Sequence, residues 1–144
     1  MESGQFWRKL LSRGVGSRRP AVRVPPVPRI DLFLIRLAPA TVFLVHGYLK
    51  LFGGYHDRTV ALFLTVNIPF AEQAAWFIGA LELAGGLALL TGVLIRPLAL
   101  LLAIEMAVAI AVVRFRQTFV GGWEFELALL LVCLGIALRR WSSD

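Results

Sequence analysis

The sequence predicts an all-α protein, a transmembrane four-helix bundle with a basic N-terminal arm. Of its 144 residues, 58% are hydrophobic and only 17% are charged, which is too little polar surface for a soluble domain of this size. The apolar residues form long unbroken runs rather than amphipathic stripes, as membrane-spanning helices do. The charge is also unevenly placed, and this divides the chain into an arm at residues 1–29 and a membrane domain at residues 30–144.

The arm carries the whole formal charge of the protein. Residues 1–29 contain seven Lys and Arg against the single acid Glu2, which gives +6, whereas residues 30–144 contain eight basic and eight acidic residues. A basic segment beside a hydrophobic helix favours the cytoplasmic leaflet, and this membrane role explains the charge without nucleic acid. Residues 5–13 predict a short interfacial helix. Four prolines between Pro20 and Pro28 favour an extended linker, either disordered or reaching toward a partner.

Four apolar segments are long enough to cross a membrane. We expect these spans at residues 30–52, 71–94, 97–114 and 123–138. The link at residues 95–97 is so short that the second and third helices must be antiparallel neighbours, and Pro97 suits a first helical turn. The semi-apolar loop at residues 53–70 is expected either in the membrane interface or folded over the mouth of the bundle.

The distribution of Lys and Arg predicts how the chain is inserted. The arm, Arg96 in the second-to-third link, and Arg139 with Arg140 after the fourth span all fall on one side of the membrane. Basic residues concentrate on the cytoplasmic side. The sequence therefore predicts a multi-pass protein of the cell (inner) membrane with both termini in the cytoplasm.

Ionisable side chains inside the spans are the strongest indication of a functional site, because each costs roughly 2.5–3.5 kcal/mol to insert at mid-membrane. The candidate buried polar or ligand-binding residues are Arg36, His46, Lys50, Glu82, Glu105 and Glu126. On the first helix, His46 and Lys50 share one face. Side chains tilt toward the N-terminus of their helix, so Glu82 on the antiparallel second helix leans toward that face.

Depth and tilt together predict the charge pairs. We expect Glu82 to pair with His46 or Lys50. We expect Glu126 to pair with Lys50 or Arg114, because both acid and partner lie in the outer half of the bilayer. Glu105 lies at about the depth of Arg36, which predicts a pair between them.

Two interpretations of this cluster stay open. A carboxyl group with His and Lys nearby in apolar surroundings can move protons or bind a polar head group, and a quinone has such a head group on a lipid tail. Alternatively, neutralised pairs hold the helices in register. Gly79, Gly85 and Gly86 fit either close helix packing or a flat ligand, packing being the simpler explanation.

Other cofactor classes receive less support. The single cysteine, Cys133, excludes a CxxC dithiol within this chain and is expected to pack as a small apolar residue. Two histidines without clustered Cys or Asp predict no structural metal site. His46 as a haem or pigment ligand is the weaker alternative, because a lone helical histidine is more often structural.

Two motifs resemble the DoxX family of small four-helix membrane proteins. The first is Arg36 followed by the segment HGYLKLFG at residues 46–53, and the second is LELAGGLALLTGVLIR at residues 81–96. An acid at the start of the fourth helix, here Glu126, is also similar to that family. The resemblance covers about residues 30–138 and implies a four-helix membrane bundle. It further implies association with quinone-reducing thiosulfate oxidoreductases or with membrane oxidoreductase complexes in oxidative-stress defence.

These observations leave two functional hypotheses. The first is a subunit of a larger membrane complex with a quinone-linked or proton-linked redox role, in which other membrane subunits supply the electrons. The second is a noncatalytic accessory subunit of a respiratory or photosynthetic assembly. The chain carries no cofactor motif of its own, so we do not expect it to be catalytic alone. Quinone is the cofactor of the first hypothesis, and a haem or pigment is expected only in the second.

Overall fold

The computed structural model describes residues 29–139. The predicted interfacial helix and proline-rich linker of the arm lie outside the described residues. The described chain forms α2 (Arg29–Leu51), α3 (His56–Thr65), α4 (Ala71–Thr91), α5 (Ile95–Val108) and α6 (Glu124–Leu138). The π-helical segment η1 (Ala109–Arg114) extends α5. The segment η2 (Phe119–Trp123) precedes α6 and is kinked at Val120 and Gly121, whose backbone angles are not helical. No strand occurs between residues 29 and 139.

Four helical segments have the length and hydropathy to cross a bilayer: Ile30–Leu51, Ala71–Thr91, Ile95–Arg114 and Phe119–Leu138. These segments coincide with the predicted spans to within a few residues, so the all-α transmembrane bundle is confirmed. The chain is therefore a multi-pass membrane protein. Its outward-facing Leu, Ile, Val and Phe side chains are explained by contact with lipid.

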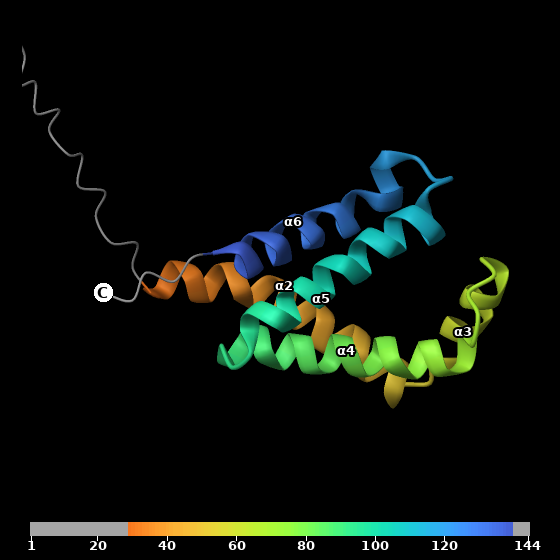
Figure 1. Cartoon of the computed structure of the whole chain (residues 1–144), viewed down its shortest axis with the longest axis horizontal. Coiled ribbons are helices and arrows are strands. Elements are labelled where there is room, and N and C mark those ends of the chain that lie inside the picture. Colours follow the sequence, from red (N-terminus) through yellow and green to blue (C-terminus); the bar gives the residue numbers. More distant parts are fainter. Residues whose placement is uncertain (1–28, 140–144) are drawn as a thin grey trace, which may run out of the picture.

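The four spans form two packed pairs rather than a symmetrical bundle. α2 packs along α4, and α5 packs along α6, while α4 also contacts α5. Figure 1 shows the two pairs close together at the end where the described chain begins and finishes, and separating toward α3. The bundle is thus a wedge that is closed at one end and opens at the other.

Glycines set how closely the helices of the wedge approach. A Cβ atom on Gly47 of α2 would lie 2.5 Å from the backbone nitrogen of Leu83 in α4. Gly79 and Gly86 meet side chains of α2, and Gly85 meets Leu102 of α5. The predicted close packing at Gly79, Gly85 and Gly86 is confirmed. Cys133 is fully buried in the core, as expected of a small apolar residue.

The structure gives the exact bounds of two connections, the α4–α5 link and the loop between α2 and α4. The link between α4 and α5 consists of residues 92–94 and not of the expected residues 95–97, which are already helical in α5. Pro97 lies in the first turn of α5 as predicted. The loop at residues 53–70 contains α3, which packs against α4 and α2. These contacts agree with the expected position of the loop over the mouth of the bundle.

The glycine contact between α2 and α4 predicts the effect of adding one methyl group. Gly47→Ala should lower stability by about 1–3 kcal/mol, because the new Cβ meets backbone that cannot move aside. Thermal unfolding of the detergent-purified protein measures this effect. Gly135→Ala is the matched control, because a Cβ there has open space. Equal melting temperatures for wild type and Gly47→Ala would contradict the packing.

Candidate functional site

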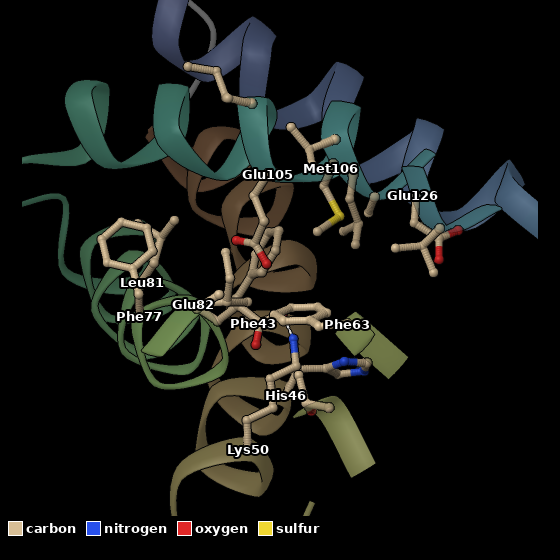
Figure 2. A pocket seen from close by; sticks show the side chains of 18 of the residues that line it. Phe43, His46, Lys50, Phe63, Phe77, Leu81, Glu82, Glu105, Met106 and Glu126 are labelled. Atoms are coloured by element: carbon tan, nitrogen blue, oxygen red, sulfur yellow. Dashed lines mark hydrogen bonds and ion pairs between the residues drawn. The ribbon is translucent and has the colours of Figure 1, made fainter. Parts of the chain in front are cut away.

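A cavity of about 500 Å³ occupies the open part of the wedge. Side chains from all five α-helices line it, and most of them are apolar, including the rings of Phe43, Phe63, Phe77 and Phe125. Figure 2 shows Lys50 and Glu82 on one wall of this cavity, Glu105 above them, and Glu126 farther along. A cavity of this size and composition suits a small organic ligand.

An ion pair between Lys50 and Glu82 lies on one wall of the cavity. The Nζ atom of Lys50 lies 2.6 Å from Oε1 of Glu82, and the side chains are 20% and 3% exposed. Each residue comes three positions after a packing glycine, Gly47 in α2 and Gly79 in α4. Residues three apart share a helix face, so the glycine contact also brings these two charges together. Lys50, rather than His46, is therefore the partner of Glu82.

Glu105 joins this pair from α5. Its side chain is buried, and its carboxyl group points toward Glu82 (Figure 2). The predicted pair of Glu105 with Arg36 is wrong. α5 packs against α4 and α6 rather than along α2. Glu105 therefore lies beside the α4 carboxylate, whereas Arg36 lies near the last turn of α4, at Gly92.

Arg36 lies at the closed end, away from the cavity. Its Nε atom donates to the carbonyl oxygen of Leu32 at 3.2 Å, and its Nη1 lies 3.2 Å from where a Cβ on Gly92 would be. Gly92 ends α4 with φ +84°, which favours glycine. A cation there meets the negative end of the α4 dipole, so Arg36 has a structural position.

The other end of the cavity carries a second pair. Nε of Arg114 donates to Oε1 of Glu126 at 3.1 Å, and Nη1 of Arg114 donates to Gln117 at 2.9 Å. Arg114 is thus the correct one of the two predicted partners of Glu126. It ends the π-helical segment η1, a type of distortion that is frequent at functional sites.

Three carboxyl groups that line the cavity each have one oxygen without a hydrogen-bond partner among the described residues. Within residues 29–139, Oε2 of Glu82, Glu105 and Glu126 is buried without a hydrogen-bond partner. Buried acceptors ordinarily find a donor. Unpaired oxygens that converge on one cavity therefore indicate where a ligand or a proton is received.

The α3 helix supplies the part of the site that sequence reasoning missed. Thr59, Leu62 and Phe63 reach the cavity from α3, and His46 lines it from α2. The Nε2 atom of His56 lies 3.2 Å from Glu72, and its ring stacks on Trp76 with centroids 4.3 Å apart. These contacts hold α3 on α4. Within residues 29–139, no three His, Cys, Asp or Glu side chains gather as metal ligands.

Replacing one partner of the Lys50–Glu82 pair should lower stability more than neutralising both partners. Lys50→Met leaves a buried carboxylate without its cation and should lower stability by roughly 3–5 kcal/mol. Adding Glu82→Gln removes that charge and should recover part of the loss. Unfolding of both variants in the same detergent tests this prediction, and a double variant no more stable than Lys50→Met would contradict it.

The comparisons with known proteins agree with this architecture. The DoxX family model matches residues 32–114, which span α2 to the end of η1. A protein of Bacillus subtilis (strain 168) named "Putative oxidoreductase CatD" is 32% identical over 109 residues, which cover 76% of this chain and 78% of that protein. No solved structure gives a significant match.

Proposed function

Because the chain belongs to the DoxX family, we propose that it is a membrane subunit that binds the polar ring of a quinone and exchanges protons with it. The observation that carries this proposal is the cluster of Lys50, Glu82 and Glu105 on the wall of an otherwise apolar cavity. A quinone likewise combines a polar part, its ring, with an apolar part, its lipid-soluble tail. The apolar lining suits the tail, and the charged wall suits the ring.

The charged wall contains the groups that such a ligand needs. A lysine ammonium has three N–H donors, and Glu82 takes one of those of Lys50, which leaves others for a ring oxygen. When both are ionised, the carboxyl groups of Glu82 and Glu105 carry one more charge than the single cation Lys50 neutralises, and a bound proton removes that excess. A carboxyl group within reach of a ring oxygen can deliver or accept that proton.

The electrons in this proposal come from a partner subunit in a larger membrane complex. One cysteine cannot form a dithiol couple within a single chain, so the chain supplies binding and proton transfer. The oxidoreductase name of the Bacillus relative supports placement in a redox complex.

Replacing the central carboxylate tests the proposal. Glu82→Gln should weaken binding of a short-chain quinone by at least about tenfold, since it removes both the partner that orients Lys50 and a proton-accepting group. Isothermal titration of the detergent-purified protein measures binding, and turnover of the native complex in membranes measures function. Asp31→Asn, which changes an exposed carboxylate in the first turn of α2, is the control. Unchanged binding and turnover in Glu82→Gln would refute the proposal.

We propose further that both termini face the cytoplasm, as the basic arm and Arg96 favour. Single cysteines test this in a Cys133→Ala background. Asp57→Cys in α3 should react with a membrane-impermeant maleimide in intact cells, whereas Val93→Cys in the α4–α5 link should react only after lysis. Both positions are exposed. The reverse labelling pattern would invert the topology.

A further inference from the structure

We infer that the cavity takes its ligand from the bilayer through an opening between α4 and α5, and that the tail of the bound ligand stays in the lipid. This inference rests on the proposed function for the identity of the ring. It adds the class of quinone, one with a long membrane-dissolved tail rather than a water-soluble ring, and the side of the cavity by which it enters.

The cavity is too small to enclose a long lipid tail. Its volume of about 500 Å³ is in the range that holds a compact organic molecule, whereas an extended tail that crosses the hydrocarbon core spans roughly 30 Å. A quinone that comes from the membrane therefore leaves most of its tail outside. Such a ligand needs an edge of the cavity that is both apolar and open to lipid.

Side chains of α4 and α5 form an edge of this kind. Phe77, Ile104 and Val108 line the cavity and are nevertheless 63%, 51% and 49% exposed. Side chains that line a cavity and are also exposed mark where it opens. All three are apolar, so contact with lipid leaves no hydrogen-bonding side chain unsatisfied at this edge.

This opening lies at membrane depth. α4 and α5 touch where Gly85 meets the side chain of Leu102. At a helical rise of about 1.5 Å per residue, Phe77 lies about 12 Å from Gly85 along α4, and Val108 lies about 9 Å from Leu102 along α5, both toward the open end. Both residues belong to segments with the length and hydropathy to cross a bilayer. The opening therefore faces hydrocarbon rather than water.

The opposite edge of the cavity is polar. In Figure 2, Phe77 lies on one side of the Lys50–Glu82 pair, and His46 and Glu126 lie on the other. A hydrocarbon tail gains nothing from polar side chains, whereas the apolar edge leads it into lipid without loss of a hydrogen bond. The geometry therefore assigns the ring to the charged wall and the tail to the opening between α4 and α5.

Photolabelling of the full-length protein in nanodiscs locates the tail. The probe is a quinone that carries a diazirine on its tail close to the ring, and peptide mass spectrometry identifies the labelled residues. Label should appear on Phe77, Ile104 or Val108, and excess short-chain quinone should displace it. Displaceable label at Phe125 of α6 instead would overturn this inference and leave the proposed function standing. Labelling that excess quinone does not displace would overturn both.

Tail length gives a second test on the wild type. At equal concentration per lipid, long-tailed and short-tailed quinones should bind with affinities within about twofold of each other, because the additional tail lies in hydrocarbon before and after binding. An enclosed cavity would have to accommodate the whole tail and would bind the long-tailed quinone at least about tenfold more weakly. That result would overturn the inference.

A matched pair of substitutions tests which edge the ligand passes. Phe77→Trp should narrow the opening and slow association of the long-tailed quinone by at least about threefold. Phe125→Trp is the control, because Phe125 also lines the cavity and is 51% exposed, and it should leave the association rate unchanged. Slower association in Phe125→Trp alone would place the entry on the opposite edge and overturn the inference.

Discussion

The contact between α2 and α4 at the Lys50–Glu82 pair is the constraint on which the rest of the structure depends. At Gly47 the α2 backbone lies so close to the α4 backbone that no Cβ fits, and at Gly79 the α4 backbone lies against side chains of α2. Each charge lies one turn beyond its glycine. Direct contact at 2.6 Å lets the attraction between the two charges offset the free energy that is lost when both are removed from water. Close backbone packing and charge neutralisation therefore support one another at a single crossing.

The two ends of the wedge differ: the closed end is tightly packed and the open end contains the cavity. At the closed end, Arg36 lies beside the last turn of α4 and small residues let α4 pack on α5. At the open end, the α5–α6 pair diverges from α2 and α4 (Figure 1), and α3 covers part of the space between them. A bundle packed tightly along its whole length would have no room for a ligand. The cavity exists because the α2–α4 pair and the α5–α6 pair contact one another at one end and separate at the other (Figure 1).

The polar groups of the cavity are more numerous than helix packing requires. One ion pair would be enough to hold α2 in register with α4, yet Glu105 adds a carboxyl group that has no cation of its own among the described residues. Burial of an uncompensated carboxyl group lowers stability, and such costs are characteristic of functional sites in membrane proteins. The proposed ligand or proton would give this additional carboxyl group a role that structural pairing alone does not.

The sequence by itself determined the membrane class and the four spans, and it limited each of two acids to two possible partners, because these follow from apolar run length, helical rise and side-chain tilt. Glu82 with Lys50 and Glu126 with Arg114 were both among the expected pairs. Which helix faces which is a different kind of information. It placed Glu105 beside Glu82 instead of Arg36, and it brought α3 over the cavity through His56 and Trp76. Only the tertiary structure could decide these contacts, because depth in a membrane specifies one coordinate of a side chain and the packing of the helices specifies the other two.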